Sequence, residues 1–166
     1  LSLSYAVITS VTRDDLADGG ASHFAETILA IKKKNPGTKV EVLIPDFNGD
    51  EKALAAVVQA KPDVISHNLE TVEALYPQIR RPKANYRRSL EVLAKAKEKG
   101  MITKSGLMLG LGEKEEEIIQ TLSDLRKVSS DLLTMGQYLQ PTKTNASTQK
   151  YYSPQQFDRL KRIALS

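Results

Sequence analysis

The 166-residue sequence contains no cysteine and no tryptophan, and its two histidines are His23 and His67. Without cysteine, these residues form no disulfide, offer no thiolate nucleophile and cannot build a thiolate-ligated metal cluster. A zinc site would have to rely on carboxylates, because no HExxH spacing is present. We therefore predict no metal ligand and assign no catalytic residue within this chain.

The low aromatic content and the absence of long apolar runs disfavour nucleic-acid-binding and membrane proteins. Aromatic residues make up only 5% of the chain and do not alternate with basic residues, so we expect no nucleic-acid partner. No uncharged apolar run approaches the roughly 18 residues that a membrane span needs, so we expect no membrane partner. No signal peptide is visible. With 40% hydrophobic residues, the chain suits one domain over residues 1–166.

The net charge is only +4, but basic residues gather in three places. These clusters are Lys32–Lys34, Arg80–Arg81 and Arg87–Arg88. Most such clusters are solvated helix faces, although they can also attract an acidic partner or a phosphate. Arg87 and Arg88 stand near the expected start of a helix, where the helix dipole disfavours cations. We therefore expect at least one of them to bind an anion.

Short β-branched runs alternate with amphipathic segments along the whole chain. The pattern predicts strands over 5–11, 39–45, 63–69, 102–110 and 131–139, and helices over 25–35, 51–60, 85–100, 113–128 and 153–166. Asp50 is the expected N-cap of the second helix, and Ser153 followed by Pro154 opens the last one. Five β-then-α units predict parallel strands in either a doubly wound sheet or a barrel. The strand spacing matches a barrel, and no GxGxxG turn follows the first strand.

Every predicted strand ends in polar or glycine-rich residues. Because ligands gather at the carboxyl ends of parallel strands, these ends predict a ligand-binding rim. Asn68 and Glu70 are two residues apart, so in a strand they would point the same way and could hold a vicinal diol such as a ribose. Capping of the following turn is the other interpretation of these two residues. We expect His67 to be a hydrogen-bonded residue near the rim rather than a base.

Six stretches of the chain carry a family resemblance and occur in that family's order. They read YAVITSVTRDDLADGGASHFAETI, EVLIPDF, DVISHNLETV, RRPKANYRRSLEVL, KSGLMLGLGE and TMGQYLQPT. Together they resemble the lipoyl synthases, which are radical S-adenosylmethionine enzymes. The resemblance runs from about residue 5 to the end of the chain. It implies a partial parallel (βα)6 TIM-like barrel, of which the five predicted strands are the second to the sixth.

The resemblance also implies cofactors, a reaction and a partner. The cofactors are S-adenosylmethionine and two [4Fe–4S] clusters, one to generate a 5′-deoxyadenosyl radical and one to supply sulfur. The reaction inserts two sulfur atoms into an octanoyl chain on a lysine of a lipoyl carrier domain. Such domains are generally acidic, which would suit the basic clusters. The expected location is the cytoplasm, with mitochondrion or plastid as alternatives.

The resemblance assigns cofactor-binding roles by position. It places Asn68 and Glu70 on the ribose diol, and Arg88 and Ser89 near the methionine carboxylate. Four further residues, from the first loop, the GLMLGLGE turn and the last strand, are expected to line the same cofactor pocket: Thr12, Gly110, Gln137 and Leu139.

The sequence departs from the family pattern in its missing cysteines. Neither the CxxxCxxC motif nor the auxiliary CxxxxxCxxxxxC motif occurs, and Ser129-Ser130 stands where the family often has a cysteine. We therefore expect these residues to be inactive alone and to be part of a complete lipoyl synthase. A noncatalytic module that binds S-adenosylmethionine remains an alternative. So does an unrelated aldolase or isomerase barrel, which would need a Schiff-base lysine or an acid/base pair at a strand end. Lys104 is the sole lysine well inside a predicted strand.

Overall fold

The structure is a computed structural model that describes residues 3–80 and 82–166. Five strands form one parallel sheet in the order β1-β2-β3-β4-β5. Their bounds are β1 Tyr5–Thr9, β2 Lys39–Leu43, β3 Val64–Ser66, β4 Ile102–Leu109 and β5 Leu132–Gln137. Strand order follows chain order, so each crossover joins neighbouring strands, as in a TIM-like barrel. The sheet does not close on itself, which confirms the predicted partial barrel.

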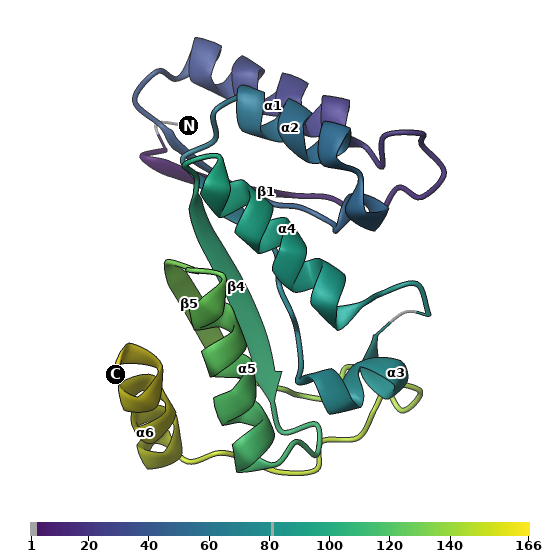
Figure 1. Cartoon of the computed structure of the whole chain (residues 1–166), viewed down its shortest axis with the longest axis vertical. Helices are drawn as coiled ribbons and strands as arrows, with labels where there is room; N and C mark the ends of the chain where they lie inside the picture. The colour runs from purple at the N-terminus through teal and green to yellow at the C-terminus, as the bar shows by residue number, and fades with distance from the viewer. Residues whose placement is uncertain (1–2, 81) are drawn as a thin grey trace.

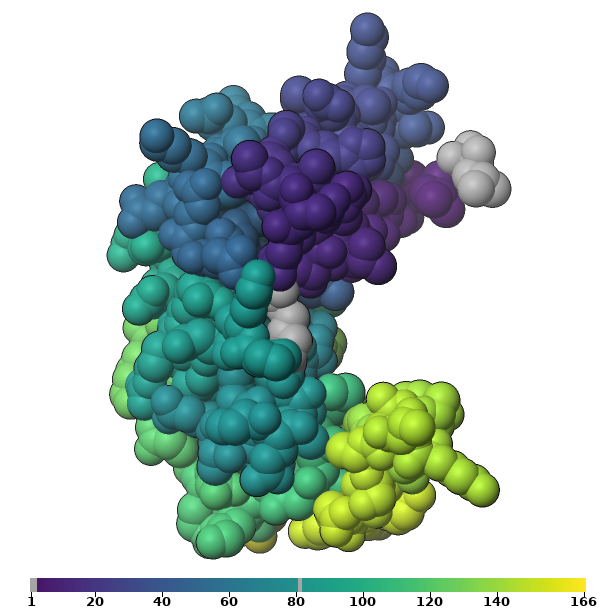
Figure 2. Space-filling view, turned by 90° about the vertical axis from the view of Figure 1, so that its right-hand side faces the viewer, coloured from purple at the N-terminus to yellow at the C-terminus, as the bar shows by residue number. Residues whose placement is uncertain are grey.

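Helices connect successive strands and cover one face of the sheet (Figure 1). The α-helices are α1 Ala21–Lys34, α2 Glu51–Gln59, α3 Tyr76–Ile79, α4 Tyr86–Glu98, α5 Glu115–Lys127 and α6 Pro154–Leu165. Two short 3₁₀ helices, η1 Phe47–Gly49 and η2 Glu73–Leu75, lie beyond the carboxyl ends of β2 and β3. The opposite face of the sheet is open. In Figure 2 the molecule has a C-shaped outline, with the N-terminal and C-terminal segments at its two ends.

The apolar core lies between the sheet and its helices and has two parts. One part packs α1, α2 and α4 on β2 and β3, and includes Ile28, Val40, Val42 and Ile65, all 0% exposed. The second part packs α4, α5 and α6 on β4 and includes Leu93, Leu107 and Ile118. Because side chains alternate along a strand, the residues between these core positions point to the concave face.

All ten predicted elements exist, and the predicted N-caps are confirmed. The Asp50 carboxylate accepts hydrogen bonds from the Lys52 and Ala53 amides, and Ser153 forms a capping box with Gln156. Helix α1 begins four residues before its predicted start, because the Asp18 carboxylate accepts hydrogen bonds from the Gly20 and Ser22 amides. The sequence pattern missed α3, η1 and η2, which are too short to show a hydrophobic period.

The strands end earlier than predicted. β2 stops at Leu43, because Asp46 begins a turn and its carboxylate accepts a hydrogen bond from the Asn48 amide. β3 was predicted to reach residue 69 but stops at Ser66. Beyond it, one isolated bridge joins Glu70 to Leu107 of β4. The polar residues at these strand ends therefore lie in loops rather than in the sheet.

The burial of α1 gives a stability prediction with a matched neighbour. Ile28 is 0% exposed within the core, whereas Leu29 is 56% exposed. Ile28→Ala should lower the free energy of unfolding by about 2–5 kcal/mol, because it leaves a cavity. Leu29→Ala should change it by no more than about 0.5 kcal/mol. Urea denaturation of both variants checks this, and equal losses would contradict the packing of α1.

Candidate functional site

A hollow of about 160 Å³, which we call the rim hollow, lies at the carboxyl edge of β1, β2 and β3. It brings together three of the residues predicted to bind a cofactor, from two different loops: Thr12, Asn68 and Glu70. Asp46, His67 and Arg80 also line it. Carboxylate, amide, hydroxyl and guanidinium groups thus face one small space at the predicted rim, where a polar ligand would find both donors and acceptors.

Backbone contacts with β4 fix Asn68 and Glu70 at this hollow. The Glu70 amide donates to the Gly106 carbonyl at 2.9 Å, and the Met108 amide donates to the Glu70 carbonyl at 2.8 Å. Glu70 has a φ of +70°, which is rare for a residue other than glycine. Beside it, a Cβ on Gly106 would lie 2.8 Å from the Asn68 Oδ1. Gly106 therefore leaves the space in which the Asn68 amide sits.

Asn68 and Glu70 share the hollow for a different reason from the predicted one. They were expected to point the same way as alternate residues of one strand. The regular strand ends at Ser66, and the positive φ of Glu70 brings its side chain to the hollow from a loop. Such backbone strain is often found at ligand sites. A single sequence carries no signal for it.

His67 and Asp46 are buried at the floor of the hollow, 4% exposed each. The His67 Nδ1 lies 2.8 Å from the Ile44 carbonyl oxygen, which fits the predicted hydrogen-bonded role. Arg88 donates from Nε to the Asp46 carboxylate at 2.8 Å. Burial acts to raise the pKa of Asp46, but the Arg88 guanidinium and the Asn48 amide outweigh it and hold that pKa below its usual value.

The anion expected for Arg87 or Arg88 is a carboxylate of this chain in both cases. Arg87 binds Glu73 through two hydrogen bonds of 2.9 Å each, and Arg88 binds Asp46 and the Lys83 carbonyl. Ser89 is 1% exposed and faces the Tyr76 hydroxyl. Arg88 and Ser89 thus lie on α4 within contacts of the fold itself. Arg81 lies outside the described residues.

Gly110 and Gln137 belong to a second cluster, which anchors the segment before α6. Gln137 donates from Nε2 to the Lys150 carbonyl, and its Oε1 accepts from the Tyr152 amide. The Gly110 carbonyl accepts from the Gln149 amide at 2.8 Å. Leu139 is 64% exposed. The structure therefore does not bring Gly110, Gln137 or Leu139 to the hollow that Asn68 and Glu70 line.

Two backbone amides of the GLGE turn, residues 110–113, already have hydrogen-bond partners within the chain. The Glu113 carboxylate accepts hydrogen bonds from the Gly110 amide at 2.7 Å and the Leu111 amide at 2.9 Å, and the Tyr152 hydroxyl donates to it at 2.9 Å. A glycine-rich turn in this position can either offer its backbone amides to a ligand or serve only as a tight connection between β4 and α5. The hydrogen bonds to Glu113 favour the tight connection.

A polar network on the concave face was not predicted from the sequence. The Tyr5 hydroxyl donates to Glu41 Oε2 at 2.6 Å, and Lys104 Nζ lies 2.9 Å from Glu41 Oε1. The three side chains come from β1, β2 and β4, and the Glu41 side chain is 5% exposed. Lys104, the lysine considered for Schiff-base chemistry, is thus held as an ion pair. The hydrogen bond to Glu41 and then burial raise the pKa of Tyr5 to about 12.

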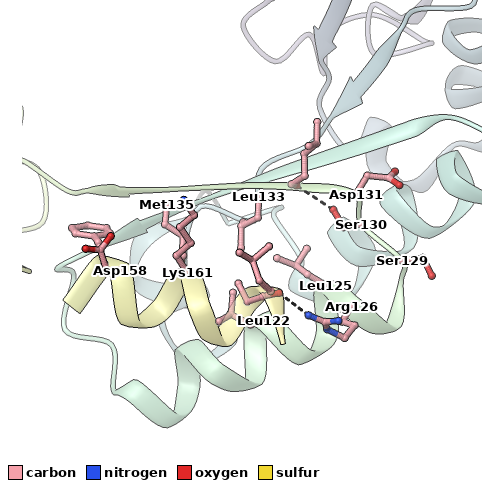
Figure 3. Close-up of a pocket in the computed structure, with 14 residues that line it drawn as sticks. Leu122, Leu125, Arg126, Ser129, Ser130, Asp131, Leu133, Met135, Asp158 and Lys161 are labelled. Carbon is pink, nitrogen blue, oxygen red and sulfur yellow. Dashed lines mark hydrogen bonds between the residues drawn. The ribbon is translucent and has the colours of Figure 1, made fainter. Parts of the chain in front are cut away.

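A larger groove, of about 710 Å³, lies between β5, α5 and α6 (Figure 3). Leu122, Leu125, Leu133 and Met135 give it apolar walls, and Arg126 and Lys161 lie at its margin. It follows the outer edge of β5, which pairs only with β4 in the described sheet. None of the residues that we predicted to bind a cofactor lines it, so the rim hollow is the better candidate despite its smaller volume.

No group of three or more His, Asp or Glu side chains in residues 3–80 and 82–166 could hold a metal ion. None of the helices in these residues combines the length and the hydropathy that a membrane-spanning helix requires.

Comparisons with known proteins agree with the resemblance seen in the motifs. Residues 2–125 match the family model of the Radical SAM superfamily. A lipoyl synthase from Caldicellulosiruptor saccharolyticus is 58% identical over 168 residues, covering 100% of this chain and 59% of the relative. A lipoyl synthase from Rubrobacter xylanophilus is 56% identical, covering 99% of this chain and 52% of the relative. The chain thus spans little more than half the length of these relatives.

Solved structures share the fold at low sequence identity. Methylornithine synthase matches with a TM-score of 0.77 at 16% identity, over 99% of this chain and 48% of that one. The hydrogenase maturase HydG matches with a TM-score of 0.74 at 15% identity, over 98% of this chain and 38% of that one. Streptococcus suis SuiB bound to S-adenosylmethionine matches at 0.68 and 12% identity, over 97% of this chain and 36% of that one. These likenesses support the partial barrel.

The backbone contacts of Gly110 give a prediction with a second glycine as control. Gly110 has a φ of +109°, and a Cβ there would lie 2.5 Å from Gln137 Nε2 and would collide with the Lys150 carbonyl. Gly110→Ala should lower the free energy of unfolding by about 1–3 kcal/mol and speed amide exchange at Gln149 and Tyr152. Gly136→Ala, where a Cβ meets nothing within 4 Å, should leave exchange there unchanged. Hydrogen exchange read by mass spectrometry separates the two.

The Tyr5–Glu41 contact predicts a late tyrosine titration. Subtracting the tyrosinate absorbance of Tyr5→Phe from that of the parent protein should give a transition with its midpoint near pH 12. Folded Tyr5 holds its proton more tightly than the unfolded chain does, so this contact stabilises the fold fully below about pH 10. That contribution is lost as pH rises through about 12. A difference transition near the ordinary tyrosine value would show that Tyr5 does not donate to Glu41.

Proposed function

The chain belongs to the Radical SAM superfamily and, within it, to the lipoyl synthases, and from this premise we propose that it forms the S-adenosylmethionine-binding barrel of a lipoyl synthase. The complete enzyme would insert two sulfur atoms into an octanoyl chain on a lysine of a carrier protein. The observation that carries the proposal is the rim hollow, where Thr12, Asn68 and Glu70 meet at the carboxyl edge of the sheet.

The residues of the hollow fit the polar parts of S-adenosylmethionine. Glu70 can accept hydrogen bonds from two ribose hydroxyls, and Asn68 can both donate and accept. Gly106 keeps the adjacent space clear, because a Cβ there would collide with Asn68. When bound, S-adenosylmethionine supplies an activated carbon on its sulfonium. The part played by Asn68 and Glu70 is to fix the ribose, and through it the position of that carbon.

The residues of this chain do not fit a [4Fe–4S] cluster. There is no cysteine among the 166 residues, and the described residues hold no alternative group of metal-binding side chains. We therefore derive no step through a cluster from these residues. The proposal places the cluster ligands of the enzyme outside them, and these 166 residues alone should be inactive.

The missing cysteines support one second candidate function. A barrel that keeps the rim hollow without a cluster could bind S-adenosylmethionine and act as a noncatalytic module. Micromolar affinity for the cofactor in cluster-free protein, with no turnover in the full-length protein, would favour this module. Turnover that depends on reconstituted clusters would favour lipoyl synthase.

The partner and the location follow from the same proposal. The substrate would be an octanoylated lipoyl carrier domain. The two relatives named above are from bacteria, which supports a cytoplasmic location. Mitochondrion or plastid are the alternatives that the family allows.

The roles of Asn68 and Glu70 can be tested by binding alone. Asn68→Ala and Glu70→Ala should each weaken S-adenosylmethionine binding by about tenfold or more, because each removes hydrogen bonds to a partly buried polar ligand. Glu116→Ala serves as the control, since Glu116 is an exposed carboxylate in the first turn of α5. Isothermal titration calorimetry on the full-length protein measures all three affinities. Unchanged affinity in both variants would show that Asn68 and Glu70 do not bind the cofactor and would favour the interpretation that they cap the following turn.

A further inference from the structure

A second hollow, of about 440 Å³, lies next to the rim hollow and is formed by the chain between β3 and α4. We call it the Tyr–Pro hollow. Its lining includes Tyr76, Pro77, Pro82, Ala84 and Tyr86. Arg80 lines both this hollow and the one that contains Asn68 and Glu70. A molecule seated in the Tyr–Pro hollow would therefore lie directly beside the proposed cofactor site.

Five of the nine lining residues are aromatic, proline or alanine, and the other four are Glu73, Arg80, Asn85 and Arg87. Tyr76 and Tyr86 pack edge to face, with ring centroids 5.3 Å apart and planes at 89°. The Tyr86 hydroxyl donates to the Asp124 carboxylate at 3.1 Å, which anchors this ring on α5. Two prolines flank the pair of rings. Aromatic and proline-lined grooves of this kind suit an extended polypeptide segment, since they bind it without having to order themselves first.

The cations around the Tyr–Pro hollow are not all neutralised. The Arg87 guanidinium is paired with Glu73. Arg80 and Lys83, by contrast, form no ion pair with any carboxylate of the described residues. The Nε of Arg80 is buried and has no hydrogen-bond partner there either. The guanidinium carbon of Arg80 lies 5.8 Å from the centre of the Tyr76 ring, so its charge stands over the lining of the hollow.

The other basic cluster of the chain lies at the wrong edge for such a contact. Lys32–Lys34 end α1, which runs from the carboxyl end of β1 back to the amino end of β2. Lys32 also pairs with Asp63, just before β3. The topology therefore separates this cluster from the rim. Among the described residues of the segment that forms the hollow, Arg80 and Lys83 are the cations without an ion pair.

From these contacts we propose that the Tyr–Pro hollow is the docking surface for an acidic, extended segment of the protein substrate. The inference rests on the proposed function, under which the substrate is a lysine-borne acyl chain on another protein. The carboxylates of an acidic segment would neutralise the charges of Arg80 and Lys83, and its apolar residues would cover the tyrosine and proline side chains. The modified lysine beside that segment would then extend past Arg80 toward Asn68 and Glu70.

The first test uses one exposed position and two opposite charges. Pro77 is exposed on α3, so Pro77→Glu and Pro77→Lys alter the same site of the hollow with little effect on the core. The full-length protein, supplied with S-adenosylmethionine but without reductant, is titrated with an octanoylated lipoyl carrier domain by biolayer interferometry. Pro77→Glu should raise the Kd by about tenfold, and Pro77→Lys should leave it unchanged or lower it. Equal effects of the two variants would overturn the acidic partner.

The second test asks where the charge acts. Arg80→Glu together with Lys83→Glu should raise the Kd for the carrier domain by at least about tenfold, and the loss should shrink at high salt. Lys33→Glu together with Lys34→Glu changes the net charge by the same amount at the opposite edge and should have little effect. Equal losses of affinity in the two double variants would show non-specific electrostatic attraction and would contradict the proposed docking surface.

The docking surface and the proposed function fail in different ways. Conversion of a neutral tripeptide that carries octanoyl-lysine tests the function without any acidic segment. If the unaltered protein with reconstituted clusters does not convert this peptide, the proposed function is wrong. If it does, and the carrier domain still binds Pro77→Glu with unchanged Kd, the docking surface alone is wrong.

Discussion

The candidate site depends on one short backbone pairing, between Glu70 and β4. The Glu70 amide and carbonyl both bond to β4, to the Gly106 carbonyl and the Met108 amide. This pairing extends the sheet by a single residue after β3 has ended, and it holds Glu70 at a positive φ. This strained backbone conformation is maintained because the two hydrogen bonds and the burial of Leu69 hold Glu70 in place. Without this pairing, the segment after Ser66 would not be held in the conformation that places Asn68 and Glu70 at the same hollow.

The sequence alone predicts much of the fold, because the fold follows from repetition. The β-then-α alternation gives five parallel strands and their helices, and capping residues such as Asp50 and Ser153 mark two helix starts. The candidate site is predicted less well. Thr12, Asn68 and Glu70 meet as expected, but Arg88 is held by Asp46, and Gln137 holds the segment before α6. Such pairings join residues far apart in the sequence, so no local pattern reveals them.

Ion pairs divide the arginines around the site into two kinds. Arg87 and Arg88 lie at the start of α4, where the helix dipole is unfavourable, and each is compensated by a carboxylate from a preceding turn. These two arginines tie α4 to η2 and to the turn after β2, and so they shape the walls of both hollows. Arg80 lies outside this arrangement and between the hollows. Position in the fold, more than the presence of a basic cluster, therefore decides which cation is available to a ligand.

The polar network on the concave face explains how the open side of the half-barrel tolerates charge. Glu41 is buried on the inner side of β2, where an unpaired carboxylate would be strongly destabilising. The Tyr5 hydroxyl and the Lys104 ammonium each bind one of its oxygens, so both are satisfied by neighbours from β1 and β4. The contact between Lys104 and Glu41 links β2 and β4, which are not adjacent, across β3. The sheet is therefore held together from its concave side by polar contacts and from its convex side by apolar packing. Both sets of contacts include β4, the strand that carries Gly106 and pairs with the backbone of Glu70, so they help to fix the strand on which the position of Asn68 and Glu70 depends.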